Sequence, residues 1–260
     1  MKRILLLFSI IFFISSCTDD GNTISGPSSS SSYVFVACEG TFGASDGAVY
    51  MIDEYGNTSS IGSLGDVVQS VEVYGNKSFV IVNNSHRIMV YNISENGISE
   101  PGIEILTGNS SPREMVVLND KVYFTNWNTK DIKVLNLFTY QIESSMVLDG
   151  LPEDIITDGQ NLYVSMSNLV LYDTNLGSSV VKVDPVSLSI LETYDVGLGP
   201  ESLLMFNDDI YVARKNYSSD WMTTYYGSSK ISDGMVTSLN YGAGIACGGS
   251  ILLSNNMVYR

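Results

Sequence analysis

Carboxylate side chains recur in the sequence directly after prolines. They lie one or two residues beyond Pro112, Pro152 and Pro200, and they are Glu114, Glu153, Asp154 and Glu201. Two neighbouring carboxylates can serve as a general acid and a general base when their surroundings separate their pKa values. Equivalent positions in successive copies of a repeat more often cap turns, so we expect a structural role and assign no catalytic residue.

Other catalytic signatures are sparse. The single histidine, His86, lies in a turn between two apolar segments, where we expect it to be exposed. The sequence contains no Cys-x-x-Cys, no His-Glu-x-x-His and no Asp-x-Asp-x-Asp-Gly, so neither a metal nor a cofactor is predicted. It also lacks a Gly-x-Ser-x-Gly elbow, which leaves little basis for a serine hydrolase. An enzymatic activity is therefore left open and is less favoured than binding.

Aromatic side chains outside the apolar segments are the candidates for ligand contact. They are Trp127, between two asparagines, and three residues of a segment at 217–226 that interrupts the strand pattern: Trp221, Tyr225 and Tyr226. Exposed aromatics supply contact area at a low cost in side-chain entropy. The alternative is that they pack between structural units, and the sequence favours neither.

The first 32 residues are typical of a targeting segment. Lys2 and Arg3 precede the apolar run 4–14, which is too short to span a bilayer. The run ends in Ile-Ser-Ser-Cys, which resembles the bacterial lipobox and predicts a signal peptide at 1–16 and lipidation of Cys17. An ordinary signal peptide with a chance cysteine is the alternative. Attachment of several acyl chains would make a stable membrane anchor.

Residues 17–32 are interpreted as the anchor and a serine-rich tether. Asp19 and Asp20 resemble a surface-export signal, so we expect an outer-membrane lipoprotein that faces outward. The alternatives are a periplasm-facing orientation and retention in the inner membrane, which aspartate near this position can also signal. Removal of Lys2 and Arg3 leaves 11 basic against 28 acidic residues, a net charge of −17. Such a charge argues against a nucleic-acid partner, because phosphates are neutralised by clustered lysine and arginine.

Residues 33–260 contain an internal repeat. An aromatic residue opens an apolar segment every 40 to 48 residues, at Tyr33, Phe79, Tyr123, Tyr163, Tyr211 and Tyr259. A proline stands eleven residues before three of them, and Gly, Asn or Asp turn residues precede five of them. This period predicts an all-β fold, a β-propeller of four-stranded antiparallel blades with about five blades present. A β-sandwich is the structural alternative.

The clearest copy of the repeat shows four strands. They are expected at 115–118, 122–126, 132–136 and 141–148, with a tight turn at Asn119-Asp120 between the first two. No segment has a sustained helical period, so helices are not expected.

Tyr123-Phe124-Thr125-Asn126 is similar to the Tyr-Val-Thr-Asn signature of YVTN-repeat (YncE-like) β-propellers. Segments at 39–43, 64–70, 82–85 and 111–114 resemble surface lipoproteins of that family, although Cys38 replaces its usual asparagine. The resemblance implies a module that binds a small molecule such as a cobalamin, or an envelope partner such as an outer-membrane transporter. It also leaves open a lyase, lactonase or quinoprotein, or an adhesive surface protein.

The closure of the ring has two interpretations. Propellers of that family commonly have seven blades, and about five are present here, so the first interpretation is a C-terminally truncated fragment. Alternatively, the segment near 250–254 returns to pair with the opening strand. In that case the expected strand register would place Cys38 opposite Cys247, and the two could form a disulfide in an oxidising compartment.

Overall fold

The computed structural model describes residues 32–174, 176–244 and 250–260. The predicted signal peptide, Cys17, all of the tether except Ser32, and Cys247 lie outside these ranges. Within them the regular structure consists of β-strands alone, as expected from the sequence. None of the described residues belongs to a helix long and apolar enough to cross a membrane.

The strands form a series of antiparallel sheets along the chain. The first sheet has three strands, β1 (Val34–Cys38), β2 (Ala48–Ile52) and β3 (Thr58–Ile61). The second contains β4 (Val68–Tyr74), β5 (Lys77–Val82), β6 (Arg87–Ser94) and β7 (Gly97–Leu106). The third contains β8 (Pro112–Leu118), β9 (Lys121–Asn126), β10 (Asp131–Asn136) and β11 (Ile142–Val147).

Two more four-stranded sheets and a hairpin follow. The fourth sheet contains β12 (Leu151–Thr157), β13 (Leu162–Asn168), β14 (Leu176–Asp184) and β15 (Ser189–Asp195). The fifth contains β16 (Pro200–Phe206), β17 (Asp209–Tyr217), β18 (Thr224–Ser232) and β19 (Met235–Gly244). The hairpin consists of β20 (Leu252–Ser254) and β21 (Met257–Tyr259).

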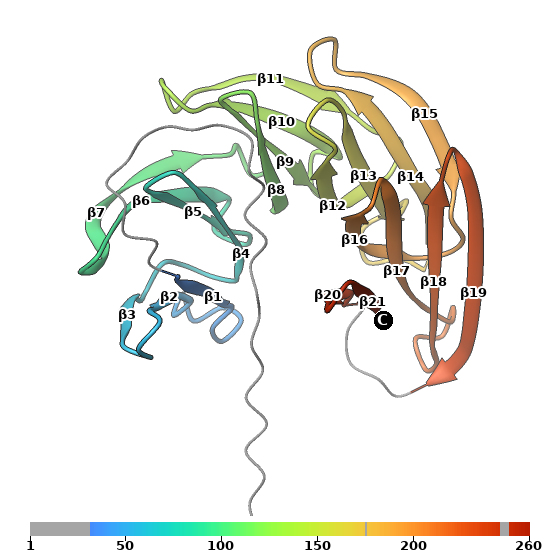
Figure 1. Ribbon diagram of the computed structural model, residues 1–260, viewed down its shortest axis with the longest axis horizontal. Helices are drawn as coiled ribbons and strands as arrows, with labels where there is room; N and C mark the ends of the chain where they lie inside the picture. The colour runs from blue at the N-terminus through green and yellow to red at the C-terminus, as the bar shows by residue number, and fades with distance from the viewer. Residues whose placement is uncertain (1–31, 175, 245–249) are drawn as a thin grey trace, which may run out of the picture.

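The sheets follow one another around a common centre and form an open arc (Figure 1). In each four-stranded sheet the first strand is innermost, and we label the strand positions A to D from the centre outward. This radial order confirms the propeller. The alternative of a β-sandwich is wrong, because the described sheets follow one another around a centre and do not form a single facing pair. β1 packs beside β4 as β9 packs beside β12, so β1 occupies position B, and no strand in the described part of the chain occupies position A of the first sheet. β20 packs beside β16, which places the hairpin at positions A and B of a sixth unit.

Strand direction alternates, so successive connections lie at opposite ends of the sheets. Connections from B to C and from D to the next A lie on one face, which we call the loop face. It includes the segments 39–47, 169–174 and 218–223. Connections from A to B and from C to D are turns of two to five residues and form the opposite face, the turn face.

The core consists of separate apolar layers between neighbouring sheets. One layer places Tyr123 and Val134 of the third sheet against Ile155 and Val164 of the fourth. Equivalent layers lie between the first and second, second and third, and fourth and fifth sheets. Burying each layer removes apolar surface from water and is the main force that holds successive sheets together.

The predicted turns adopt the expected backbone conformation. Asn119 and Asp120 both have positive φ, as do Asn207 and Asp208. The expected register is correct near these turns, since Val116 opposes Tyr123. A bulge between Pro112 and Met115 then shifts it by one residue. The predicted pairing of Cys38 with Cys247 stays a prediction, because Cys247 lies outside the described residues.

Candidate functional site

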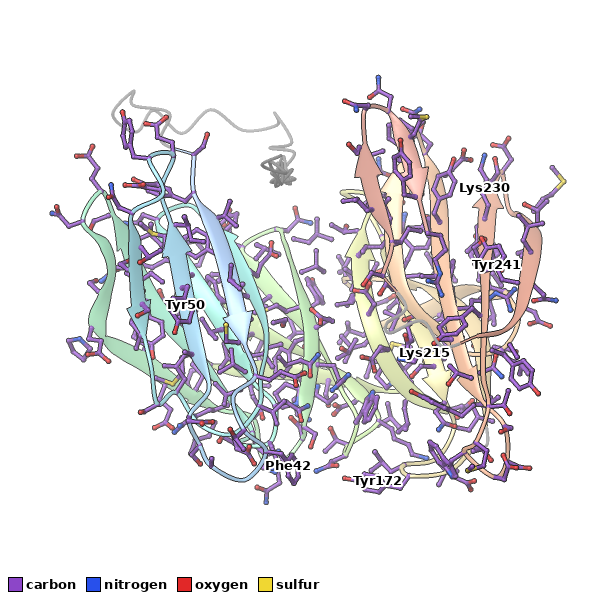
Figure 2. The ribbon with its side chains drawn as sticks, turned by 90° about the horizontal axis from the view of Figure 1, so that it is seen from below. Phe42, Tyr50, Tyr172, Lys215, Lys230 and Tyr241 are labelled. Carbon is purple, nitrogen blue, oxygen red and sulfur yellow. The ribbon has the colours of Figure 1, made fainter. Side chains whose placement is uncertain are left out.

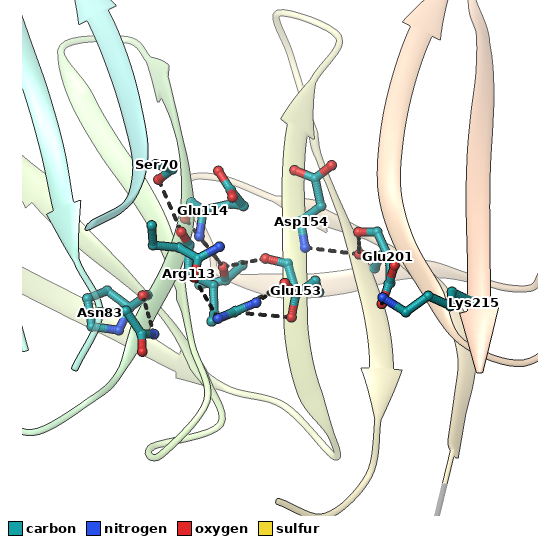
Figure 3. A network of polar contacts seen from close by, with 12 residues as sticks. Ser70, Asn83, Arg113, Glu114, Glu153, Asp154, Glu201 and Lys215 are labelled. Atoms are coloured by element: carbon teal, nitrogen blue, oxygen red, sulfur yellow. Dashed lines mark hydrogen bonds and ion pairs between the residues drawn. The ribbon is translucent and has the colours of Figure 1, made fainter. Parts of the chain in front are cut away.

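The candidate site is built on the A strands, where each enters the sheet from the loop face. Bulges at the beginning of β4, β8, β12 and β16 turn polar side chains toward one another across neighbouring sheets. Together with Lys215 of β17 they form what we call the inner-wall cluster: Gln69, Arg113, Glu114, Glu153, Asp154, Glu201 and Lys215. Figure 3 shows its charged members. The carboxylates therefore lie along the centre of the arc. This location differs from the turn-capping role that we expected from the sequence.

Arg113 occupies the middle of this cluster. Its Nε lies 3.2 Å from each carboxylate oxygen of Glu153, and its second terminal nitrogen lies 2.5 Å from Oε1. The other terminal nitrogen donates to Gln69 Oε1 at 2.8 Å. The guanidinium also lies 4.2 Å from the centre of the Trp127 ring. A planar guanidinium suits this combination of a forked ion pair and an aromatic stack better than lysine would.

Two carboxyl groups of the cluster have strongly altered acidity. Burial raises the pKa of Glu114 to about 8, and the charges of Asp154 and Glu153 contribute to the shift. Burial also raises the pKa of Asp154 to about 6, although the backbone N–H groups of Leu203 and Ile155 donate to its carboxylate at 2.7 Å each. Glu114 is thus mostly protonated at neutral pH and can donate a hydrogen bond, whereas Asp154 is mostly ionised.

A second ion pair completes the cluster on the fifth sheet. Lys215 Nζ lies 3.0 Å from Glu201 Oε1, and burial raises the pKa of that glutamate while Lys215 opposes the shift. Lys215 also lies 5.8 Å from the centre of the Tyr217 ring. The cluster therefore combines four carboxyl groups with two basic groups, and no cluster of described His, Cys, Asp or Glu residues is arranged to hold a metal ion.

The predicted aromatic contacts have different environments. Trp127 is half-buried against Arg113, and its indole N–H has no hydrogen-bond partner among the described residues. Trp221 is 52% exposed on the loop 218–223, with its ring centre 5.5 Å from that of Tyr217. Tyr225 is 41% exposed, whereas Tyr226 is half-buried and lies 5.7 Å from the Arg260 guanidinium.

The segment 217–226 is not an insertion outside the strands, as the sequence had suggested. β17 extends to Tyr217 and β18 begins at Thr224, so that Tyr225 pairs with Asn216 and Tyr226 pairs with Lys215. A longer hairpin arm therefore carries Trp221 at its tip on the loop face.

Sequence analysis missed two strongly exposed aromatics on the same face. Phe42 is 80% exposed in the β1–β2 loop, and Tyr172 is 92% exposed in the β13–β14 loop. Figure 2 shows both at one face of the molecule. Their loops could have been recognised in the sequence, because these B-to-C connections are longer than the tight turns of the repeat. That the two loops share one face follows only from the direction of the strands.

His86 differs from its expected exposure. It is half-buried in its turn, and its Nδ1 accepts a hydrogen bond from the backbone N–H of Ser111 in the next sheet at 3.1 Å. The side chain therefore joins two sheets. Cys38, the described member of the predicted disulfide, is half-buried at the end of β1.

Comparison with known proteins supports the architecture. No family model and no curated protein matches the sequence. A solved structure of a candidate 6-phosphogluconolactonase from Bacteroides uniformis aligns with a TM-score of 0.64 and 12% identity, over 86% of this chain and 72% of that one. The WD40 β-propeller domain of Doa1 aligns with a TM-score of 0.53 and 13% identity, over 78% of this chain and 63% of that one.

Hydrazine synthase from Kuenenia stuttgartiensis is also similar, with a TM-score of 0.59 and 15% identity over 75% of this chain. The chain spans 60% of that protein's length. Identities this low establish the fold alone, and the YVTN-repeat family stays a prediction from the sequence motifs. The strand order and these similarities together show that the chain is an all-β protein built from the four-stranded antiparallel sheets of a β-propeller.

Proposed function

We propose that the protein is an envelope-anchored lipoprotein that captures a ligand or partner on its loop face. The observation that carries this proposal is the gathering of exposed aromatic side chains on that face. Phe42, Tyr172 and Trp221 come from loops of three different sheets, and all three are exposed on that face. Loops held on a rigid scaffold are common binding surfaces, and aromatic rings supply most of the contact energy in many of them.

The direction of chain entry agrees with this function. β1 occupies position B, so the chain enters it from the turn face, the side opposite the aromatic loops. An anchor at Cys17 would therefore attach to the far side of the molecule and leave the loop face directed away from the membrane. This arrangement suits capture of a molecule from the surroundings.

Calorimetry of the full-length chain in a mild non-ionic detergent tests the proposal. The probes are a cobalamin, which represents delivery to an outer-membrane transporter, and neutral oligosaccharides. Trp221→Ala and Tyr172→Ala should each weaken binding about tenfold, the loss typical of a contact-dominating aromatic. Phe138→Ala on the turn face is the matched control and should leave the affinity unchanged. If neither probe binds, capture of these ligands is ruled out.

A second candidate function rests on the carboxyl pair of the inner-wall cluster. The pKa of Glu114 is raised to about 8 and that of Asp154 to about 6. Such a difference would let Glu114 act as a general acid and Asp154 as a general base. The similarity to a candidate 6-phosphogluconolactonase suggests lactone hydrolysis as the reaction to measure. Turnover that disappears in Glu114→Gln would support an enzyme, and no hydrolysis by the native chain would leave binding as the sole proposal.

A further inference from the structure

On the turn face, three of the C-to-D turns each carry one large, exposed apolar side chain at the tip. Tyr55, Phe138 and Val186 are 82%, 77% and 89% exposed. They occupy the same place in the first, third and fourth sheets. Scattered apolar residues are ordinary on a protein surface. Three at one repeat position, on one face, indicate a shared contact surface.

Each tip is held by the same local structure. Asp53 Oδ1 accepts the backbone N–H of Tyr55 at 2.9 Å, Asn136 Oδ1 that of Phe138 at 2.9 Å, and Asp184 Oδ1 that of Val186 at 2.8 Å. Such Asx turns fix the backbone of a short connection. The three apolar side chains are therefore held outward on ordered turns.

The N-terminal side of the domain lies at this face. The chain enters β1 at the turn face, and Cys17 lies 16 residues before Tyr33. A chain of that length spans at most about 55 Å. A lipid anchor at Cys17 would therefore hold the domain within about that distance of the membrane and raise the local concentration of the turn face there.

The charge of the turn face limits the kind of lipid that it fits. Exposed carboxylates from six different turns lie there, namely Glu54, Glu95, Asp120, Asp158, Asp208 and Asp233. Lys121, on the same face, is already paired with Glu143 at 2.6 Å. An anionic bilayer would repel this surface, whereas the ammonium groups of zwitterionic headgroups complement it.

We propose that the turn face rests on a zwitterionic lipid surface, with Tyr55, Phe138 and Val186 inserted among the headgroups. This inference rests on the proposed anchor at Cys17. Its consequence is a fixed orientation in which the loop face with Phe42 and Tyr172 is presented away from the bilayer (Figure 2).

Quenching by brominated lipids tests the orientation in the full-length lipidated chain. The chain is reconstituted into phosphatidylcholine vesicles with bromine on the acyl chains, and Phe138→Trp is compared with Tyr172→Trp. Both positions are exposed aromatics, and the native Trp127 and Trp221 on the loop face provide a constant background. The emission added by Phe138→Trp should be mostly lost, while that added by Tyr172→Trp should persist. Val186→Trp repeats the measurement at a second turn.

The outcomes separate the anchor from the docked orientation. If the chain floats with the vesicles but neither turn-face tryptophan is quenched, the docking proposal is overturned and the anchor stands. If the native chain floats no better than Cys17→Ser, the anchor is wrong and the docking proposal with it. Equal quenching of Phe138→Trp and Tyr172→Trp would also overturn it. If Phe138→Trp is quenched as strongly on brominated phosphatidylglycerol vesicles as on phosphatidylcholine vesicles, the preference for a zwitterionic over an anionic surface is contradicted.

Discussion

Arg113 joins three successive sheets, since it extends from β8 to Gln69 of β4 and to Glu153 of β12. Its side chain is 18% exposed and that of Glu153 is 14% exposed, so water screens the pair only weakly. Removing one partner leaves a largely buried charge without compensation, which costs more than the pair itself contributes.

Arg113→Ala should lower the free energy of unfolding by about 3 kcal/mol, because it isolates Glu153 and removes the stack on Trp127. Arg113→Lys should fall between that variant and the native chain, since it keeps the charge without the planar fork. Urea denaturation measures both. Lys121→Ala breaks a more exposed pair and should cost about 0.5 kcal/mol. Equal losses in Arg113→Ala and Lys121→Ala would contradict the central role of Arg113.

Glu114 should make the fold less stable as pH rises. Its pKa is raised from an ordinary value of 4.5 to about 8, so the folded state favours the protonated carboxyl. Stability due to this group is complete below pH 4.5 and is lost as pH rises through about 8, by at most about 1.4 kcal/mol per pH unit. Glu114→Gln should remove that slope.

Melting temperatures between pH 5 and pH 9 test this sign. The native chain should lose more stability over this range than Glu114→Gln, and the two curves should separate most above pH 8. Glu54→Gln, at an exposed turn residue, is the control and should follow the native curve. A Glu114→Gln chain whose pH dependence matches the native one would show that the carboxyl is already ionised in the fold.

At the scale of the strand, the Tyr-Phe-Thr-Asn residues of β9 join neighbouring sheets of the propeller. Tyr123 is buried in the layer between the third and fourth sheets. Thr125 Oγ1 donates to the backbone oxygen of Glu153 on β12 at 2.7 Å, and Asn126 accepts a hydrogen bond from Ser110. Ser165 makes the bond equivalent to that of Thr125, to Glu201 O on β16 at 3.1 Å. The B strand of one sheet thus holds the A strand of the next.

Thr125→Val keeps the shape of the side chain and removes this bond, leaving Glu153 O without its donor. We expect a loss of about 1 to 2 kcal/mol in the free energy of unfolding by urea. Thr125→Ser is the matched control, since it retains the hydroxyl, and it should recover most of the loss that depends on hydrogen bonding. A Thr125→Val chain as stable as the native one would mean that apolar packing alone joins these sheets.

Much of each sheet could be predicted from these local patterns. The strand expected at 122–126 is β9, and the strand expected at 132–136 is β10, each one residue longer in the structure. The carboxylates were found by their spacing from the prolines. Their meeting with Arg113 and Lys215 could not be predicted, because it depends on bulges and on contacts between sheets some 40 residues apart. The aromatic loops were assigned incompletely because alternation of strand direction, not composition, decides which face a loop occupies.

On the scale of the whole molecule, the first sheet differs from the other full sheets because no strand among the described residues occupies its innermost position. β1 pairs with β2 on one side and with no described strand on the other. Val34 and Val36 are consequently 39% and 37% exposed, whereas β9, paired on both sides, is almost entirely buried. A free strand edge presents unpaired backbone groups to any strand that can reach it.

Hydrogen exchange measured by mass spectrometry reports directly on this edge. Alternate amides of β1 have no strand partner, so peptides over 34–38 should exchange much faster than peptides over 121–126 of β9, in which both edges are paired. Slow exchange at β1 would contradict the free edge and show that another strand occupies position A. Protection that grows with protein concentration would identify a second copy as its source. Protection that disappears on reduction would instead favour closure within the chain by the predicted Cys38–Cys247 disulfide, because only that interaction depends on a covalent bond between the two ends of the arc.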